Sequence, residues 1–287
     1  MSDLTEWHGL DRVVDAAIRE DVGDGDITTA WTVRPNARAR AVLVARESGV
    51  IAGLAVAGRV FHRVDARIRV TARTGDGARV DAADVLAEVD GPARGILTAE
   101  RTALNFLQRM SGIATLASAY VAAVAGTGVR ILDTRKTSPG LRMLDKYAVA
   151  AGGGTNHRSG LHDMVLLKEN HIEAADGIGP AVAAVKSAMA RDRRRVMIEV
   201  EVKTLRELDD ALAAGVDRVM LDNMDLDAIR LAVARVRAAG PESPLLEASG
   251  NVTRESVRAV AETGVDLISV GALTHSAHAL DMSLLFQ

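Results

Sequence analysis

The stretch RVMIEVEVKTLRELDDALAAGVDRVMLDN, residues 195–223, decides the fold. It holds two short apolar runs, RVMIEV and VDRVML, on either side of an amphipathic segment with the apolar spacing of a helix. That segment closes at Gly215, as a helix commonly does just before the next strand. Apolar strands that alternate with helices are typical of a parallel sheet whose faces are covered by helices.

The same rhythm extends on both sides of this stretch. Six apolar runs are centred near residues 132, 166, 198, 219, 245 and 268. Most of the gaps between them contain an Ala-rich amphipathic segment, such as AVAAVKSAMA or LDAIRLAVARVRAAG. Both an open doubly wound sheet and a closed barrel fit this alternation.

The polar residues at the ends of the runs favour the barrel. Each run ends in, or is followed at once by, reactive residues: Asp133-Thr134-Arg135-Lys136, Lys168-Glu169-Asn170-His171, Glu199 with Glu201, Asp222-Asn223, Glu247-Ala248-Ser249-Gly250 and Gly271-Ala272. A ring of functional groups at successive carboxyl ends of strands is typical of the active face of a (β/α) barrel. Because only six strand runs are visible, we expect an incomplete barrel.

The first part of the chain has a different pattern. Residues 10–20 are predicted to form an amphipathic helix, and residues 39–90 hold short β-rich runs broken by Gly and Asp turns. A long helix is predicted from about residue 98 to residue 124. We therefore expect a small α+β domain before the barrel.

The composition excludes several classes of protein. The chain has 287 residues, a net charge of −3 and no basic block interleaved with aromatics, so no nucleic-acid partner is expected. The absence of cysteine excludes disulfides, a zinc–thiolate site and a cysteine nucleophile. No apolar run is long enough to cross a bilayer and the first residues lack an apolar signal core, so we expect a cytoplasmic protein without a membrane partner. The densest basic run, residues 191–195, is interpreted as a solvated loop.

Charges of both signs collect on the predicted active face. The cations are Arg135, Lys136, Arg158 and Lys168, with His157 and His171 nearby, and the anions are Glu201 and Asp222. Several cations on one face repel one another unless an anionic ligand joins them, and Arg pairs well with carboxylates and phosphates. The two acids are oxygen ligands that suit Mg²⁺. The pattern therefore indicates a site for a small, highly anionic ligand.

Two pairs of residues need a separate interpretation. Glu199 and Glu201 share one predicted strand, and we expect one to point into the barrel mouth and the other toward the helices, with no assignment from spacing alone. His157 and His162 are five positions apart, which does not place two imidazoles on one helical face, so a zinc site is not expected.

Glycines follow several of the predicted elements. The run at 152–154 lets the backbone approach a ligand closely, but it lacks the spacing of a dinucleotide fingerprint. Ser249-Gly250-Asn251 and Gly271-Ala272 follow the last two strand runs, where barrels often bind phosphate through backbone N–H groups. Ordinary turns between strands and helices are the alternative interpretation of these segments.

The motifs DTRKT (133–137), GGGTNHR (152–158), KENH (168–171) and EVEV (199–202) occur in this order, and the chain resembles the quinolinate phosphoribosyltransferase family, that is, nicotinate-nucleotide pyrophosphorylase (carboxylating). Further matching segments are EDVGDGDITT (20–29), ESGVIAG (47–53), LTAERTALNFLQRMSGIAT (97–115), MLDNM (220–224), LEASGNV (246–252) and DLISVGALTHS (266–276). The match covers nearly the whole chain. Ala83 and Asn251 are its mild departures.

The resemblance implies a fold and an assembly. It implies an α/β protein with an N-terminal α/β sandwich domain over residues 1–110 and an incomplete six-stranded (β/α) barrel over residues 111–287. It also implies a homodimer, or a higher oligomer, in which the N-terminal domain of one subunit covers the barrel mouth of the other. Arg101 would then complete the partner's substrate pocket.

The resemblance also implies a reaction. Quinolinate and phosphoribosyl pyrophosphate would give nicotinate mononucleotide, pyrophosphate and CO₂, a step of NAD biosynthesis that uses Mg²⁺. The family's roles fall on matching positions of this chain. The quinolinate carboxylates would be held by Arg101, Arg135, His157 and Arg158, and the catalytic lysines that face quinolinate or pyrophosphate would be Lys136 and Lys168. Ribose hydroxyls or Mg²⁺ would be bound by Glu201 and Asp222, and the 5-phosphate by Ser249, Gly250, Asn251, Gly271 and Ala272.

Three other functions remain open from the sequence. One is a paralogous phosphoribosyltransferase of the same fold, either nicotinate-using or associated with molybdenum transport. Another is a Schiff-base aldolase, because Lys168 ends a barrel strand. The third is an anion-binding module without activity, since a fold does not fix a function.

Overall fold

The computed structural model describes Leu4 and residues 7–287. They form two compact units, each assembled from separate segments. The first unit comprises residues up to Ser118, Lys136–Gly153 and Ala272–Gln287, and the second comprises Ala119–Arg135 and Gly154–Gly271. The segments 136–153 and 272–287 thus lie in the first unit, and the cut between residues 110 and 111 stays a prediction about the domains of the family.

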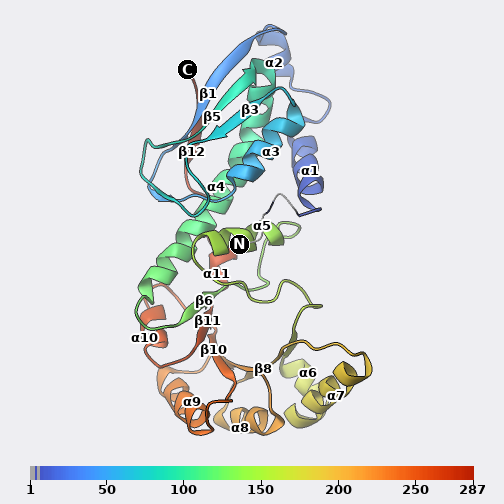
Figure 1. Ribbon diagram of the computed structural model, residues 1–287, viewed down its shortest axis with the longest axis vertical. Coiled ribbons are helices and arrows are strands. Elements are labelled where there is room, and N and C mark those ends of the chain that lie inside the picture. The colour runs from blue at the N-terminus through green and yellow to red at the C-terminus, as the bar shows by residue number, and fades with distance from the viewer. Residues whose placement is uncertain (1–3, 5–6) are drawn as a thin grey trace. The chain divides into compact units, whose positions relative to one another are not determined.

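The first unit contains a four-stranded antiparallel sheet in the order β12-β1-β5-β3 (Figure 1). Its strands are β1 (Arg38–Ala45), β3 (Arg69–Ala72), β5 (Val85–Pro92) and β12 (Met282–Phe286), beside a two-stranded pair of β2 (Gly49–Val50) and β4 (Arg79–Val80). The strand β12 comes from the end of the chain and pairs with β1 from Ala41↔Phe286 to Ala45↔Met282. The N-terminal sheet is therefore completed by C-terminal residues.

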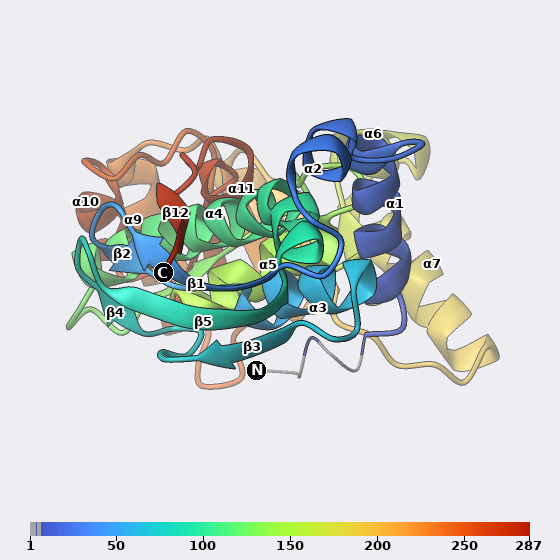
Figure 2. The ribbon, with the colours of Figure 1, turned by 90° about the horizontal axis from the view of Figure 1, so that it is seen from above.

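Helices accompany this sheet, in keeping with the expected α/β character. They are α1 (Leu10–Val22), α2 (Ile27–Thr32), α3 (Leu54–Val64) and α4 (Ala93–Ala123), and α4 continues into the second unit. Figure 2 shows β1 and β5 beside α4. The helix α3 buries Val56, Val60 and Phe61, and full burial of such side chains stabilises by roughly 1.5–3 kcal/mol each.

Buried polar contacts fix the segment 136–153 in the first unit. Its helix α5 (Arg142–Ala151) carries Asp145, whose side chain is fully buried. The carboxylate accepts two hydrogen bonds from Arg109 of α4 and a third from the amide of Ser138. Arg109 also donates to the carbonyl of Thr274, which lies in the short helix α11 (Ala272–His275). A buried, multiply bonded carboxylate of this kind is strongly destabilising to disrupt.

The second unit contains a six-stranded parallel sheet in the order β6-β11-β10-β9-β8-β7. The strands are β6 (Arg130–Leu132), β7 (Val165–Leu167), β8 (Ile198–Val202), β9 (Arg218–Asp222), β10 (Leu245–Ser249) and β11 (Leu267–Ser269). Consecutive strands β6 and β7 occupy opposite edges of the sheet. On its outer side β6 does not pair with β7, and Leu132 of β6 forms a parallel bridge to Thr155. This is the predicted incomplete six-stranded barrel, and each predicted strand run is confirmed.

The connecting helices begin and end where their local sequence predicts. They are α6 (Glu169–Ala174), α7 (Ile178–Arg191), α8 (Leu205–Ala214), α9 (Leu226–Ala238) and α10 (Val257–Ala261). Thr204 and Glu207 form a capping box at α8, and Asp225 caps α9. Gly215 ends α8 in the left-handed region at φ 67°. In Figure 1, α7, α8 and α9 lie along one side of the sheet.

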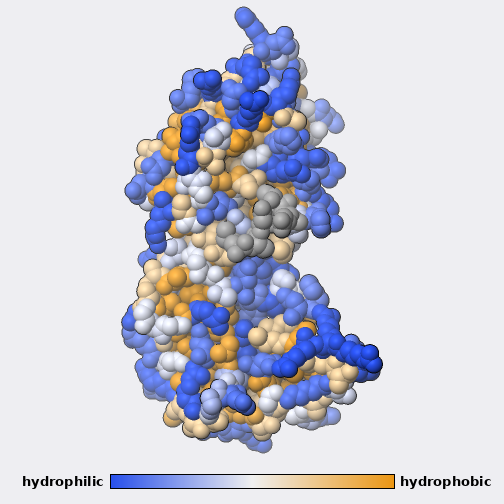
Figure 3. Space-filling view, viewed as in Figure 1, coloured by the Kyte–Doolittle hydropathy of each residue, from blue (hydrophilic) through white to orange (hydrophobic). Residues whose placement is uncertain are grey.

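The surface carries mostly hydrophilic side chains. On the face drawn in Figure 3, hydrophobic side chains lie in scattered patches between hydrophilic ones. Among the described residues, we find no helix with the length and hydropathy needed to span a membrane.

A glycine of α4 tests the packing of the first unit. A Cβ on Gly112 would lie 1.9 Å from the carbonyl oxygen of His278, whereas a Cβ on Gly58 of α3 would meet no atom closer than 4.0 Å. We expect Gly112→Ala to lower the free energy of unfolding by about 3 kcal/mol. Gly58→Ala is the matched control and should raise it by up to about 1 kcal/mol. Denaturant unfolding measures both, and equal stability of the two variants would contradict the packing described here.

Candidate active site

The register of the parallel sheet gathers the strand-end residues. Glu201 is paired with Met220, Asp222 with Ser249, and Ser249 with Ser269. Lys168 directly follows β7. Four adjacent strands, β7 to β10, therefore end in Lys168, Glu201, Asp222 and Ser249 at the same edge of the sheet, the edge at which barrel enzymes carry their sites.

The two glutamates of β8 point to the same side of the sheet. Residues two apart on a strand share a face, so the expectation that one of them faces the helices is wrong. Glu199 is fully buried and contacts His157, whereas Glu201 lies nearer the end of the strand and pairs with Lys168. They differ in depth within the barrel and not in face.

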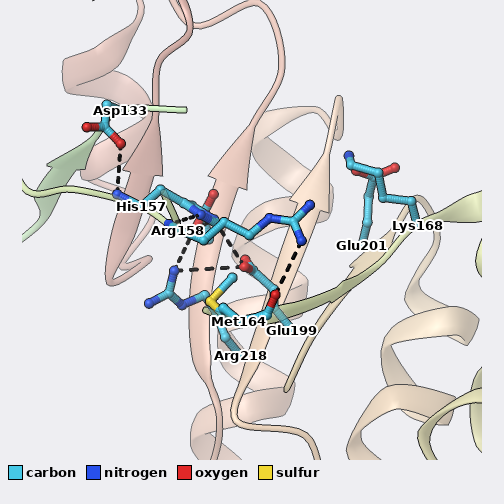
Figure 4. Close-up of polar contacts among 9 residues, drawn as sticks. Asp133, His157, Arg158, Met164, Lys168, Glu199, Glu201 and Arg218 are labelled. Atoms are coloured by element: carbon cyan, nitrogen blue, oxygen red, sulfur yellow. Dashed lines mark hydrogen bonds and ion pairs between the residues drawn. The ribbon is translucent and has the colours of Figure 1, made fainter. Parts of the chain in front are cut away.

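Lys168 and Glu201 form an ion pair at the barrel mouth (Figure 4). The Lys168 side chain is 47% exposed and that of Glu201 only 11%, so the pair has one side open to a ligand. Lys203, which pairs with Glu169, has its pKa raised first by that partner and further by the charges of Asp222 and Glu201. Glu201 and Asp222 are therefore both close enough to Lys203 for their charges to act on it.

Arg135 and Arg158 bring like charges together beside these strands. Burial lowers the pKa of Arg158, and the positive charge of Arg135 lowers it further. Arg158 also donates to the carbonyl of Met164 at 3.3 Å. Two cations held within range of each other in a partly buried place favour an anion that bridges them.

Asp133 holds the segment that carries Arg158 through a hydrogen bond to its backbone. Asp133 is fully buried and its carboxylate accepts the amide of His157 at 2.8 Å. Its own amide donates to the carbonyl of Thr155, which continues the bridge to β6. The glycine run before it permits the sharp approach, since Gly153 has φ 89°.

A group of buried charges lies deeper in the barrel. Nε2 of His157 is 3.1 Å from Glu199 and 3.5 Å from Glu247, and Arg218 is 3.1 Å from Glu247 and 3.9 Å from Glu199 (Figure 4). The His157 side chain is only 5% exposed and both carboxylates are fully buried. Among the reactive residues predicted from the sequence, Glu247 is named without a role and Arg218 is not named. A charge within or at the start of an otherwise apolar strand is the signal that marks both.

The pKa values follow from this burial. Burial opposes a charge on the ring, but hydrogen bonds to Glu199 and Glu247 outweigh it and raise the pKa of His157 to about 9. Burial raises the pKa of Glu199. Burial acts in the same direction on Glu247, yet His157 and Arg218 lower the pKa of that carboxyl overall.

The turns after β9 and β10 are interlocked. Asn223 and Asn251 adopt left-handed backbone at φ 55° and 50°, and Gly250 lies between strand and turn at φ 100°. The amide of Asn223 donates to the carbonyl of Ser249, and the side chain of Asn251 donates to that of Asn223. A Cβ on Gly250 would lie 2.2 Å from Oδ1 of Asn223, so only glycine fits there. Asn251, one of the two mild departures from the family pattern, thus falls in a left-handed position that Asn tolerates.

The remaining candidates divide between the two units. Gly271 ends the second unit, whereas Arg101, Lys136 and Ala272 belong to the first. Arg101 is exposed on α4, and the carbonyl of Lys136 accepts the hydroxyl of Thr274. Their participation in the site stays a prediction.

One group of possible metal ligands stands out among residues 7–287, namely His157, Glu199 and Glu247. Arg218 already lies against both carboxylates, and a dication beside a guanidinium is electrostatically unfavourable. The oxygen donors Glu201 and Asp222, at the open edge of the sheet, fit Mg²⁺ better because it retains waters and substrate oxygens.

Family models match this chain over nearly its whole length. The description "Quinolinate phosphoribosyl transferase, N-terminal domain" matches residues 26–111, and "Quinolinate phosphoribosyl transferase, C-terminal domain" matches residues 113–285. The chain belongs to the quinolinate phosphoribosyltransferase family. Its resemblance to that family, drawn above from motifs, is confirmed.

Relatives of the family agree in sequence and in structure. The chain is 44% identical to a chloroplastic nicotinate-nucleotide pyrophosphorylase (carboxylating) of Oryza sativa subsp. japonica, over 96% of this chain and 77% of that protein. The crystal structure of NadC from Streptococcus pyogenes is similar with a TM-score of 0.92 and 40% identity, over 100% of both chains. Human nicotinic acid phosphoribosyltransferase has a TM-score of 0.62 at 16% identity, over 91% of this chain and 72% of that one, which shows a shared fold alone.

The raised pKa of His157 makes stability depend on pH. A group whose pKa is raised on folding stabilises the folded protein fully below its ordinary pKa, here 6.5, and the contribution is lost as pH rises through about 9. We expect the difference in unfolding free energy between the protein and His157→Gln to shrink between pH 7 and pH 10. Denaturant unfolding at several pH values measures it.

A constant difference over that range would contradict a charged ring. It would indicate instead that the amide of Arg158, which donates to Nδ1 at 2.7 Å, holds the ring neutral with its proton on Nε2.

Proposed function

We infer that the chain transfers the phosphoribosyl group of phosphoribosyl pyrophosphate to the ring nitrogen of quinolinate, with loss of the 2-carboxylate as CO₂ and formation of nicotinate mononucleotide. One observation carries this proposal. The proposal is supported by the cations of a chain of this family: the positive charge of Arg135 acts on Arg158, and Lys168 directly follows a strand of the same sheet as an ion pair with Glu201. Cations gathered in this way favour a multiply charged anion. Nicotinate mononucleotide made in this way feeds NAD biosynthesis.

The cations suit the dicarboxylate. Arg135 and Arg158 repel each other, and each guanidinium forms planar bidentate pairs with carboxylate. A substrate with two adjacent carboxylates relieves this repulsion more than a monocarboxylate does, which favours quinolinate over nicotinate. His157 is buried against Glu199 and Glu247, so we propose that it supports this pocket from within.

The turns after β10 and β11 suit the phosphoribosyl donor. The interlocked turns at Ser249, Gly250 and Asn251, with Gly271 and Ala272 after β11, offer backbone N–H groups to the 5-phosphate. Glu201 and Asp222 would bind the ribose hydroxyls. The same two acids would hold Mg²⁺, which when bound helps to neutralise the charge of the pyrophosphate.

The residues mainly orient the reactants and stabilise charge. The pyridine nitrogen is a weak nucleophile and needs in-line approach to ribose C1, so fixing both substrates supplies much of the rate. Negative charge grows on the departing pyrophosphate, where Lys136 and Lys168 would stabilise it. Positive charge grows on the ribose, beside Glu201 and Asp222. After transfer, the cationic ring nitrogen stabilises the carbanion left at C2 when CO₂ departs.

We propose that the active protein is a homodimer, or a higher oligomer, with a shared site. Exposed apolar side chains on α2 support this, since Ile27 is 62% exposed and Trp31 82% exposed. Large apolar residues at the surface often mark a protein interface. Arg101 would reach the partner's quinolinate.

The compartment is a separate proposal. We propose that the chain acts in the cytoplasm without a membrane or nucleic-acid partner, although the relative in rice is named as chloroplastic.

The role of Lys168 is tested by substitution. We expect Lys168→Ala to lower kcat at least 100-fold and to raise KM for quinolinate much less, because the lysine acts on charge that grows in the transition state. Initial rates with quinolinate, phosphoribosyl pyrophosphate and Mg²⁺ measure this. Lys186→Ala, on α7, is the control and should retain full turnover.

Near-unchanged turnover of Lys168→Ala would remove Lys168 from the mechanism. Failure of the unaltered protein to release CO₂ from quinolinate would overturn the proposed reaction. Trapping of a carbonyl substrate on Lys168 by borohydride would favour an aldolase instead.

The shared site predicts complementation. Subunits with Arg101→Ala and subunits with Arg135→Ala should each be inactive, but a mixed dimer contains one site with neither change. We therefore expect activity to return to roughly a quarter of normal after random subunit exchange, as symmetric pairing requires. Assays before and after verified exchange measure this, and no recovery would count against a site formed by two subunits.

A further inference from the structure

The charged side chains of Glu199, Glu247 and Arg218 are buried beneath the mouth, and the proposed reaction gives them no role. Glu199 and Glu247 are fully buried, and the Arg218 side chain is 11% exposed. They lie on three adjacent strands, β8, β9 and β10. Together with His157 they form what we call the buried charge group.

We propose that Glu199, Glu247 and Arg218 are positioning residues for quinolinate: they fix His157 and, through it, the neighbouring Arg158. The inference rests on the proposed function, because it assigns Arg158 to the quinolinate carboxylates.

The first step is the way in which His157 is held. Its ring enters the barrel with Nε2 at 3.1 Å from Glu199 and 3.5 Å from Glu247, while Nδ1 lies 2.7 Å from the amide nitrogen of Arg158. Both ring nitrogens are thus engaged inside the protein. The imidazole links the core of the barrel to the backbone of the residue that carries the guanidinium.

The second step concerns Arg158 itself. Its side chain donates a long hydrogen bond, 3.3 Å, to the carbonyl of Met164, and the nearby charge of Arg135 repels it. Such a guanidinium needs a rigid backbone to stay in place, because its own contacts are weak. Asp133 fixes that backbone from one side through the amide of His157, and the buried charge group fixes it from the other (Figure 4).

Stability alone does not account for the buried charge group. Both carboxylate oxygens of Glu199, Oε1 of Glu247 and Nε of Arg218 have no hydrogen-bond partner among the described residues, so Glu199 contacts His157 through the ion pair alone. Buried charges with incomplete hydrogen bonding are poor stabilisers, and apolar side chains of similar volume often stabilise as well or better. What the charges supply, and apolar side chains do not, is a fixed direction for the imidazole.

The experiment compares Glu247→Gln and Glu199→Gln, which keep the shape and remove the charge, with Asp209→Asn. Asp209 forms an exposed pair with Arg235 in the same unit and serves as the matched control. We expect KM for quinolinate to rise about tenfold in either Gln variant, as when a supporting partner of a ligating side chain is lost. KM for phosphoribosyl pyrophosphate should stay within about twofold, and Asp209→Asn should change neither.

Hydrogen exchange supplies a second readout. In the Gln variants, amides of residues 154–158 should exchange faster while those of strands β8 to β10 keep their protection. Arg218→Lys, which retains the charge, should give a smaller rise of KM for quinolinate than Arg218→Met.

Two results would overturn the inference. One is an unchanged KM for quinolinate in both Gln variants; the other is an equal rise of both KM values with a lowered Tm, which would indicate a purely structural role. A failure of the unaltered protein to use quinolinate would overturn the proposed function first, and the two failures are therefore distinguishable.

Discussion

The alternation of side chains along parallel strands is the constraint on which the site depends. Every second residue of β8, β9 and β10 faces the same side, so Glu199 with Glu201, Arg218 with Asp222, and Glu247 with Ser249 occupy one interior at two depths. The deeper members pair with one another and with His157. The outer members remain at the open edge, where a ligand reaches them. A shift of one residue in any strand would send its charges toward the covering helices.

Charge balance explains why the two depths behave differently. In the interior, two carboxylates face Arg218 and His157, so the negative charge is matched within the protein. At the mouth, Glu201 pairs with Lys168, while burial and then the positive charge of Arg135 lower the pKa of Arg158. We propose that an anionic substrate adds negative charge beside these cations. The charges in the barrel interior thus serve to hold the structure, and we propose that the cations at the mouth bind an anion.

Much of this arrangement is predictable from the sequence, and the exceptions have physical causes. The six strands and their reactive ends follow from apolar runs and the residues after them. The pairing of β12 with β1 was not foreseen, because MSLLF is a five-residue run whose partner lies at the other end of the chain. The placement of segment 136–153 in the first unit depends on the buried contacts of Asp145, which no local pattern reveals.

The misassigned glutamates carry a further lesson. Glu199 and Glu201 were expected on opposite faces, whereas a spacing of two already places them on the same one. A strict count would also have drawn attention to Arg218 and Glu247 as charges inside apolar strands, where an isolated charge is too costly to remain unpaired. Pairing between them then follows from adjacency of β9 and β10, which only the sheet order supplies.

A crystal structure with quinolinate bound tests the central claim most directly. The account predicts that the two carboxylates of quinolinate lie between Arg135 and Arg158 at the barrel mouth, with Lys168 within hydrogen-bond distance of the ligand. Quinolinate bound elsewhere on the chain, or at the mouth with its carboxylates turned away from both arginines, would contradict it.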